Sequence, residues 1–482
     1  MMKRYGVAAF GLVVGSLVAG ACSSDYVPAA ADAGGDAGSD VYVPPGCNTP
    51  DEPSKNAASC LVDAYGLFLK PTGNDVTGTG TKDNPLRSLG AAAAKLKGKA
   101  GRIVACAGSY EGAGTEITSA ISIYGGFSCT DWTYGPSNET VFTTDTQKPD
   151  VVLTLRSVTG VNVQDATIRA RPGAVGGGSS IAVFVASSQG VKFLRAKVEA
   201  DVGGDAQNGA TQNLTLPDGT ALQGNNADPK GAGPTDDVGG PEKLINCPGG
   251  KVTAGGKGGD FGFAGANAKP APPIGGVGGA ISDCSGGIRN GAEGATGQNG
   301  AAPTGVGALA SVGWKAAGGN PGLVGEPGGG GGGGYGAAGA GGGGGAGGCG
   351  GGPGTGGSAG GSSIALASLD SEVTLTDTSL TSKAAKKGGD GAAGQATRDE
   401  DIGPGGGRTG LACLGGNGGK GGSGGAGSGG AGGISVGAVY TKRKPTTERT
   451  QITFGAAGAA GGGQGNPGVA GVAQELLEVP ES

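Results

Sequence analysis

Hydrophobic residues in this chain gather in short runs of aliphatic and β-branched side chains, separated by glycine and polar turn residues. The first clear runs are Leu67–Leu69, Arg102–Cys106 and Ile121–Phe127. Short runs bounded by Gly, Pro, Asn and Asp are typical of β-strands. Similar runs at Val151–Leu155 and within Gly160–Ile168 predict that the strands continue. The pattern therefore indicates an all-β protein.

One segment departs from this pattern. Apolar side chains recur three and four residues apart, at Leu86, Leu89, Ala92, Ala93 and Leu96. In a helix this spacing places them on one face, so it predicts one short amphipathic helix between the first two strands.

The order of these elements resembles the opening of bacterial right-handed parallel β-helix proteins. In that family the solenoid begins with four motifs: P-x-G-x-D after a strand, an N-P-x-x-S-L capping helix, a G-x-Y turn and an I-x-I-Y-G-G-F strand. Here they fall at Pro71–Asp75, Asn84–Leu89, Gly108–Tyr110 and Ile121–Phe127. The resemblance covers residues 67–142 and implies a pectate-lyase-like solenoid, but no particular activity. A capping helix would cover the open core and the unpaired strand edge of the first coil.

Internal similarity extends the solenoid along the chain. Each copy consists of one or two predicted strands followed by glycine-rich sequence. The first copy has its strands within Ser179–Phe193 and the second within Ser362–Leu375, while a looser third copy lies within Gly433–Gly455. Such widely spaced copies predict one continuous solenoid interrupted by large insertions.

The insertions themselves are periodic in glycine. Every third residue from Gly330 to Gly360 is glycine, 11 times in succession, and from Gly415 to Gly433 seven times. A period of three matches a polyproline-II-type helix. A collagen helix is disfavoured because proline is only 26 of 482 residues and the frame slips. A flexible linker remains an alternative, but exact phasing favours a bundle of polyglycine-II-like helices that bond side by side.

The bundle hypothesis makes a prediction for each position of the frame. Glycines in frame with Gly345 should face neighbouring helices, so that Gly345→Val destabilises the bundle. Out-of-frame positions should tolerate a side chain, with Gly344→Val as the matched control and Ala346→Val as a nearly neutral change. Four further residues are expected to occupy positions that can point outward: Tyr335, Cys349, Pro353 and Thr355.

The predicted fold class is thus an all-β, right-handed parallel β-helix solenoid interrupted by glycine-rich, polyglycine-II-like segments. The predicted parts are a lipoprotein signal peptide (1–21), a flexible tether (22–46), an N-terminal β-helix part with a capping helix (47–205), a glycine-rich insertion (206–361), a β-helix coil (362–387), a second insertion (388–433), a second coil (434–455) and a glycine-rich C-terminal segment and tail (456–482).

Composition narrows the possible functions. Glycine supplies 116 of 482 residues and aromatic residues only 4%, which disfavours a single conventional core. The net charge of −5 gives no electrostatic footprint for nucleic acid. Histidine is absent, which removes the commonest general base and most zinc sites. The sequence predicts no enzyme activity, cofactor or metal site.

The N-terminus indicates export. Lys3 and Arg4 precede an uncharged apolar stretch that is too short to span a bilayer. The following Leu17–Cys22 resembles the lipobox of bacterial lipoproteins, although Ala19 stands where Leu is commoner. The resemblance implies that Cys22 is diacylated and that Ser23 directs the protein to the outer membrane. Ordinary signal cleavage that leaves Cys22 free is the alternative.

The eight cysteines after Cys22 predict disulfides, because an even number in an exported chain favours pairing. Proximity in sequence suggests Cys47–Cys60 and Cys106–Cys129. The remaining four could pair as Cys247–Cys284 and Cys349–Cys413.

The sequence therefore predicts a lipid-anchored, non-enzymatic envelope protein with a structural or adhesive role at the outer membrane, facing either the periplasm or the outside. Its expected partners are the membrane, through the lipid, and possible envelope glycans or surface proteins. The alternative is a carbohydrate-binding or polysaccharide-lyase-like β-helix. A lyase would draw on Asp145, Asp150, Asp165, Arg169 and Arg171, and a sugar-stacking surface on Tyr124, Trp132 and Tyr134.

Overall fold

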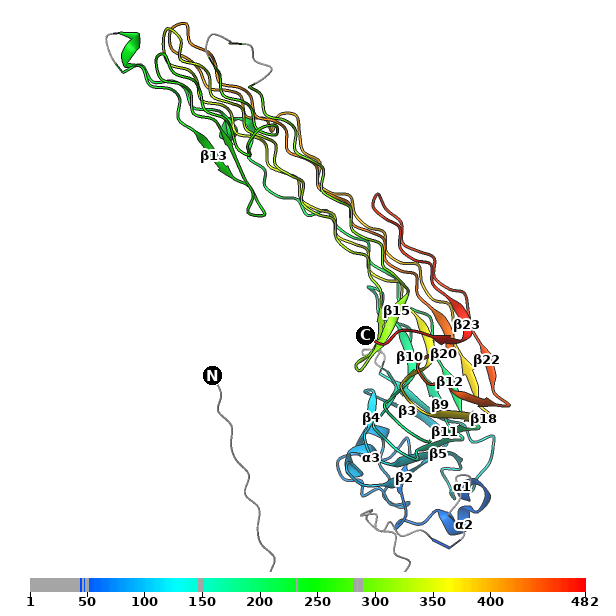
Figure 1. Cartoon of the computed structure of the whole chain (residues 1–482). Helices are drawn as coiled ribbons and strands as arrows, with labels where there is room; N and C mark the ends of the chain where they lie inside the picture. The colour runs from blue at the N-terminus through cyan, green and yellow to red at the C-terminus, as the bar shows by residue number, and fades with distance from the viewer. Residues whose placement is uncertain are drawn as a thin grey trace, which may run out of the picture. The chain divides into compact units, whose positions relative to one another are not determined.

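The structure is a computed structural model that describes residues 44–45, 47, 52–145, 151–230, 233–280, 284 and 289–482. Residues from Val41 onward form one compact unit. Three parallel sheets and a set of long glycine-rich segments make up this unit (Figure 1). The all-β class predicted from the sequence is confirmed in this coarse form.

The three sheets contain strands from the whole length of the unit. The first sheet has the order β1 (Leu67–Leu69), β2 (Gly101–Cys106), β5 (Ile121–Phe127), β8 (Asn162–Gln164), β11 (Val191–Leu194), β18 (Val373–Thr376) and β21 (Thr446–Glu448). The second has β3 (Gly108–Gly112), β6 (Thr140–Thr144), β9 (Thr167–Arg169), β12 (Lys197–Glu199), β19 (Ser379–Thr381) and β22 (Gln451–Thr453). The third has β4 (Thr115–Ile117), β7 (Leu153–Arg156), β10 (Ser180–Ala186), β17 (Ser363–Leu369), β20 (Ser435–Thr441) and β23 (Ala473–Glu478).

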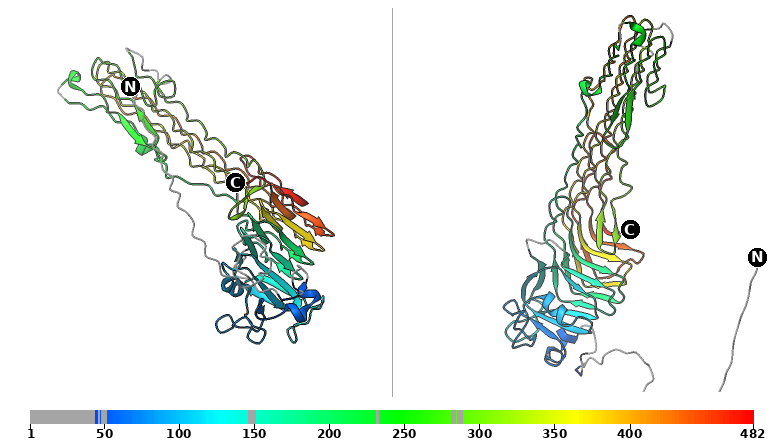
Figure 2. Two further views of the ribbon diagram at one scale, coloured as in Figure 1. Left: turned by 60° about the horizontal axis from the view of Figure 1, so that its bottom comes forward. Right: turned by 90° about the vertical axis from the view of Figure 1, so that its left-hand side faces the viewer.

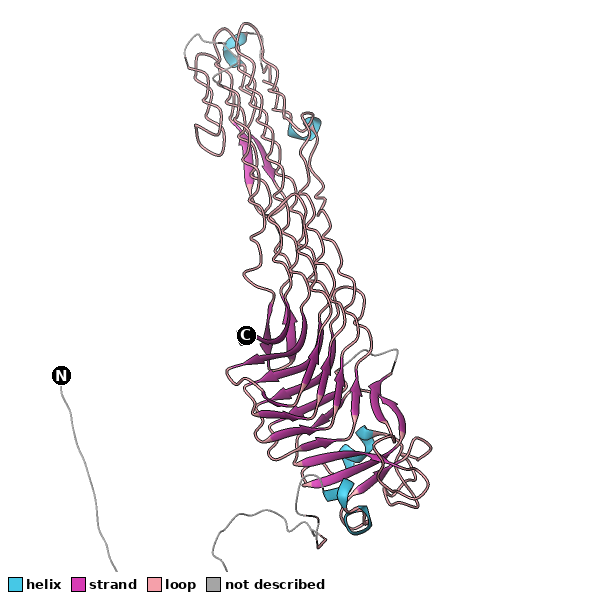
Figure 3. Ribbon diagram, turned by 90° about the vertical axis from the view of Figure 1, so that its right-hand side faces the viewer, coloured by secondary structure: helices cyan, strands magenta, loops and turns pink. Residues whose placement is uncertain are grey.

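Successive strands visit the three sheets in a fixed cycle. From β2 onward the chain passes through the first, second and third sheet and then returns to the first, with every pairing within these sheets parallel. One passage through all three sheets is called a coil below. Figure 3 shows the strands of consecutive coils stacked on one another.

All the large insertions leave the sheets at the same corner, between the second and the third sheet. They are residues 200–362 between β12 and β17, residues 382–434 between β19 and β20, and residues 454–472 between β22 and β23. The strands on either side still pair in register, for example Ser180 with Ser363 and Ser363 with Ser435. The segments recognised by internal similarity are therefore direct neighbours in the third sheet.

The main hydrophobic core lies inside the three sheets. It includes the fully buried side chains of Leu69, Ile123, Val163 and Phe193. Helix α3 (Leu89–Lys95) closes the N-terminal end with the buried residues Leu89, Ala92 and Ala93, as the helical spacing predicts. The Ser88 hydroxyl accepts a hydrogen bond from the Ala91 amide at 3.2 Å and so begins the helix.

A second hydrophobic cluster covers the outer face of the third sheet. The hairpin β15 (Gly307–Ala310) and β16 (Gly313–Ala316), part of the long insertion, packs Leu309 and Trp314 against this face. The Trp314 indole donates a hydrogen bond to the Ser362 hydroxyl at 3.1 Å. Because both faces are covered, every residue of β10 and β17 is buried.

Several elements were not predicted from the sequence. Gly108–Tyr110 belongs to strand β3 and is not a turn, and β23 lies in the expected C-terminal tail. The long insertion also holds the hairpin of β13 (Lys243–Asn246) and β14 (Val252–Gly255). The remaining short elements are α1 (Glu52–Lys55), α2 (Ala57–Cys60), α4 (Gly219–Leu222) and the 3-10 helix η1 (Pro234–Asp236).

Candidate functional site

The glycine-rich segments run side by side as a hydrogen-bonded bundle (Figure 2). Three of them form its centre and are named core segment 1 (317–334), core segment 2 (342–360) and core segment 3 (413–431). Residues 341–354 are all buried, although most of them are glycine. The interior of this bundle therefore consists of backbone instead of large apolar side chains.

Core segments 1 and 2 are antiparallel. The amide of Gly331 donates to the Gly345 carbonyl at 2.8 Å, and that of Gly325 to the Gly351 carbonyl at 3.0 Å. The bonds recur every third residue, from the Gly319 amide to the Gly334 amide. When the donor number in core segment 1 rises by three, the acceptor number in core segment 2 falls by three.

Core segment 3 closes the arrangement. The Gly345 amide donates to the Gly416 carbonyl at 3.0 Å, so core segments 2 and 3 are parallel. The Gly416 amide in turn donates to the Gly332 carbonyl of core segment 1 at 2.8 Å. Segment 1 donates to 2, segment 2 to 3 and segment 3 to 1, which is a closed cycle of backbone hydrogen bonds.

Further segments extend this cycle outward. Segment 291–300 accepts from the Gly329 amide and donates to core segment 3. Segment 385–395 donates to core segment 2 and accepts from core segment 3, for example from the Gly430 amide to the Gly389 carbonyl at 2.9 Å. Backbone groups that have no partner within their own segment are thus bonded between segments.

The packing leaves no room for a β-carbon at most glycines of the centre. A β-carbon at Gly345 would lie 2.0 Å from the Gly403 carbonyl oxygen. One at Gly344 would lie 1.8 Å from the Gly331 oxygen, and one at Gly347 would lie 2.0 Å from the Gly328 oxygen. The expectation that Gly344 is a tolerant, out-of-frame control is therefore wrong, because core segment 2 is contacted on more than one side.

The expected outward positions need the same correction. Cys349 and Ala346 are fully buried, and Pro353 is buried as well. Only Tyr335 and Thr355 of the four residues expected to point outward are partly exposed. The three-residue repeat of glycine identifies one contacted face of a segment. It does not show that a central segment is contacted on its other faces as well.

Two disulfides join segments of the bundle, and two lie in the N-terminal part of the chain. Cys47–Cys60 and Cys106–Cys129 are bonded as proximity suggests. The other two pairings are corrected: Cys247 bonds to Cys349, and Cys284 to Cys413. In the bundle, residues far apart in sequence lie on adjacent segments, so short sequence separation is a poor guide there.

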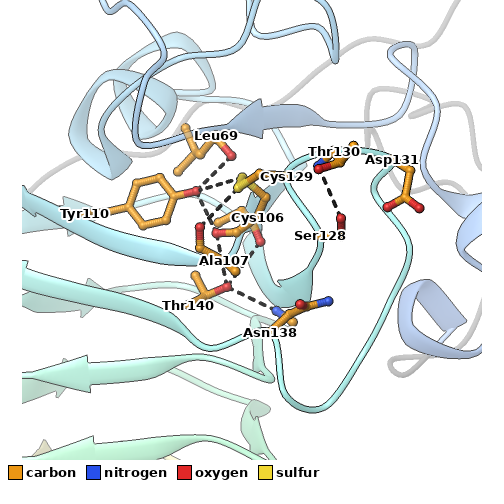
Figure 4. The surroundings of a disulfide bond; sticks show 12 residues. Leu69, Cys106, Ala107, Tyr110, Ser128, Cys129, Thr130, Asp131, Asn138 and Thr140 are labelled. Atoms are coloured by element: carbon orange, nitrogen blue, oxygen red, sulfur yellow. Dashed lines mark hydrogen bonds between the residues drawn. A yellow bond between two sulfur atoms is a disulfide. The ribbon is translucent and has the colours of Figure 1, made fainter.

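The disulfide Cys106–Cys129 lies beside a buried tyrosine. Figure 4 shows the Tyr110 hydroxyl directed at this bond; it donates to the carbonyls of Leu69 at 2.9 Å and Cys106 at 2.8 Å. Burial raises the pKa of Tyr110 well above its ordinary value. This tyrosine thus joins the first coil to its disulfide.

The charged residues considered for a lyase are mostly held in ion pairs. Arg169 lies 2.6 Å from Glu199 and Arg171 lies 2.8 Å from Glu111. Asp165 is paired with Arg195 at 2.8 Å. Asp150 lies outside the described residues. Within the described part of the chain, acidic and cysteine side chains form no cluster of three that could hold a metal ion.

The aromatic residues considered for sugar stacking are mostly packed inward. Trp132 and Tyr124 are buried, and the Trp132 ring lies 4.9 Å from the Phe68 ring in an edge-to-face contact. Tyr134 is half-buried and packs on Phe127. Trp132 and Tyr124 therefore belong to a hydrophobic cluster on the first sheet instead of an open stacking surface.

One polar cavity of about 170 Å³ lies at the corner between the first and second sheets. Its lining includes Tyr134, Asn138, Glu139, Asp165, Arg195 and Lys197. The Tyr134 hydroxyl donates to Asp165 at 2.9 Å, and burial, together with the proximity of that carboxylate, raises the pKa of Tyr134. The cavity can hold a small polar group.

Comparison of the chain with models of protein families, with curated proteins and with solved structures gives no match.

Cys22, which the sequence predicts as the lipid-attachment residue, lies outside the described residues, as do the predicted signal peptide and nearly all of the predicted tether. Among the described helices, none has the length and apolar content needed to cross a membrane.

Proposed function

We propose that this chain is a lipid-anchored, non-enzymatic cell-envelope protein with a structural or adhesive role at the outer membrane. Its body is a right-handed parallel β-helix, and its insertions form a bundle of polyglycine-II-like helices. The anchor is the diacylated Cys22, and the tether of residues 22–46 joins it to the folded part.

The closed cycle of backbone hydrogen bonds among the three core segments carries this proposal. Bonds such as Gly345 to Gly416 and Gly416 to Gly332 hold neighbouring segments at a fixed offset. Bending the bundle would slide segments against one another and break several bonds together. A rigid support that presents its ends or outer surface is the role that this construction suits best.

The disulfides support a location outside the cytoplasm. Four bonds join all eight cysteines after Cys22, and two of them, Cys247–Cys349 and Cys284–Cys413, staple the bundle. Bonds of this kind persist in oxidising compartments. They fit an exported protein that must keep its form without chaperones or energy.

Membrane fractionation of cells that express the full chain tests the anchor. The unaltered protein should be recovered with the outer membrane, whereas Cys22→Ala should be found in the soluble fraction. Ser23→Asp is the matched control, since it keeps the acylated cysteine and should move the protein to the inner membrane. Equal membrane recovery of the unaltered protein and Cys22→Ala would contradict the proposal.

The polar cavity at Tyr134 supports glycan binding as a second candidate function. A half-buried aromatic ring beside Asn138, Glu139 and Arg195 offers both a stacking face and hydrogen-bonding groups to one sugar unit. Binding of envelope oligosaccharides to the full chain and to Asn138→Ala tests it. The substitution should weaken binding, and equal binding by both would exclude this cavity.

A further inference from the structure

One corner of the stacked coils carries an unusual column of charged residues. Four charged residues on consecutive coils directly follow a strand of the first sheet and begin the turn to the second sheet: Asp165, Arg195, Asp377 and Arg449. All four have left-handed backbones, with φ of 52°, 51°, 48° and 47°. The amides of the first three donate to a carbonyl of the following coil, for example Arg195 N to Thr376 O at 3.0 Å. The four side chains therefore stack at one corner.

Opposite charges alternate along this column. Arg195 donates two hydrogen bonds of 2.8 Å to the two carboxylate oxygens of Asp165. Arg449 makes the same paired contact with Asp377, at 2.6 and 2.8 Å. At the middle step, the Arg195 amide donates to the carbonyl of Thr376, the residue before Asp377, at 3.0 Å, so opposite charges also lie on neighbouring coils there.

Backbone geometry alone does not explain these residue types. Glycine, asparagine and aspartate adopt the left-handed conformation most readily, whereas arginine does so rarely. Two of the four positions nevertheless hold arginine. The charge of the side chain must therefore matter at this corner.

The strands of consecutive coils in the third sheet resemble one another in sequence. Strands β10, β17 and β20 all begin with serine, continue with mostly apolar residues and lie in the same register. The steps between them cross the insertions 200–362 and 382–434, so chain connectivity does not force the order either. A coil that skipped its neighbour would bury a similar apolar surface.

We propose that the alternating charges of this column set the order in which the coils stack. If the coil of Arg449 stacked directly on that of Arg195, two arginines would meet. If the coil of Asp377 stacked on that of Asp165, two carboxylates would meet. Only the native order places opposite charges at every step, so the column penalises each skipped coil.

Other ion pairs between consecutive coils also join opposite charges. Lys383 lies 3.0 Å from Asp201, and Lys386 lies 2.9 Å from Asp205, across the step that the longest insertion interrupts. Lys442 lies 3.5 Å from Asp370 across the last step. Each joins a base of the later coil to an acid of the earlier one.

The order of stacking can be read from engineered disulfides in the full chain. Lys197, Ser379 and Gln451 occupy one row of the second sheet, with Lys197 opposite Ser379 and Ser379 opposite Gln451. In a chain with Lys197→Cys, Ser379→Cys and Gln451→Cys, position 379 can bond to either neighbour. Positions 197 and 451 are two strands, about 9.6 Å, apart and bond only if the middle coil is skipped.

This three-cysteine chain is then combined with Arg449→Asp, which makes the skipped order attractive and the native order repulsive. Lys444→Asp is the matched control, since it makes the same charge change on the same coil outside the column. Mass spectrometry of the oxidised proteins should find the 197–451 bond increased roughly five- to tenfold by Arg449→Asp and unchanged by Lys444→Asp.

Equal amounts of the 197–451 bond in the parent and in folded Arg449→Asp would overturn the proposal. If Arg449→Asp does not fold, Arg449→Asn replaces it, because asparagine suits the left-handed backbone and only removes the attraction. An increase of the 197–451 bond in Arg449→Asn above the parent supports the proposal, and the parent's level overturns it.

Discussion

The amide of Gly345 donates to the carbonyl of Gly416 at 3.0 Å, and the same offset recurs from Gly342 to Cys413 and from Gly348 to Gly419. Two segments from different insertions thus keep one register over their whole shared length. The register depends on glycine, because a side chain on either segment would separate the backbones.

Gly345→Val and Gly344→Val should both destabilise the bundle. Each valine would place its β-carbon about 2 Å from a carbonyl oxygen, at Gly403 or Gly331, and backbone cannot move aside cheaply. Overpacking of a buried site costs about 1–3 kcal/mol of unfolding free energy. Thermal or denaturant unfolding of the full chain measures the loss.

Gly305→Val is the control for this pair. It is also a glycine of the long insertion, but a β-carbon there would meet nothing within 4 Å. It should be neutral or slightly stabilising, because it lowers the entropy of the unfolded chain. If all three valines shift unfolding equally, the bundle does not depend on close glycine contacts.

Removal of Cys247–Cys349 should cost more stability than removal of Cys47–Cys60. The two bonds close loops with sequence separations of 102 and 13 residues. In the chain-entropy model a disulfide that closes a loop of about 100 residues stabilises the folded protein by roughly 4.7 kcal/mol, and one that closes a loop of about 15 residues by roughly 3 kcal/mol. Paired serine substitutions, compared by denaturant unfolding, measure both. A larger loss for the short loop would refute the entropic explanation.

The sequence predicts strands well where several apolar residues are consecutive. Ile121–Phe127 is predicted with its observed bounds, and all seven of its residues are buried. Strands β12 and β19 are not predicted, because each contains only one apolar residue, Val198 or Leu380. Each is extended because it pairs with the adjacent strands of the second sheet. A single inward side chain gives no periodicity to detect.

The glycine frame predicts close contact between segments but not the number of neighbours. Gly344 and Gly345 both face carbonyl groups of other segments. Which glycines do so depends on how segments from distant parts of the chain are arranged. The column of Asp165, Arg195, Asp377 and Arg449 is also hidden in the sequence. Arg195, Asp377 and Arg449 become neighbours only after the insertions are placed outside the coils.

Tyr110→Phe should destabilise the first coil modestly. The hydroxyl donates to the carbonyls of Leu69 and Cys106, and its loss leaves these buried acceptors with one partner fewer. The expected cost is about 1–2 kcal/mol. Because burial raises the pKa of Tyr110, this tyrosine should also ionise last in an alkaline absorbance titration of the folded protein. A variant with unchanged stability would show that water replaces the hydroxyl.

Acid should remove the contribution of the pair Asp377–Arg449. The guanidinium of Arg449 hydrogen-bonds the carboxylate and lowers the pKa of Asp377 below its ordinary value of about 3.9. A lowered folded-state pKa stabilises the protein above the unfolded-state value, and this stabilisation is lost as the pH falls through the folded-state pKa. The parent should therefore be more stable than Asp377→Asn at pH 7, and the difference should shrink below about pH 4.

Asp131→Asn is the control, because the pKa of Asp131 is lowered by Ser128 and Thr133 without a basic partner. Added salt should weaken the effect at Asp377 and leave that at Asp131 nearly unchanged. A difference at Asp377 that persists undiminished at acid pH would mean that the carboxylate acts through its shape and not its charge.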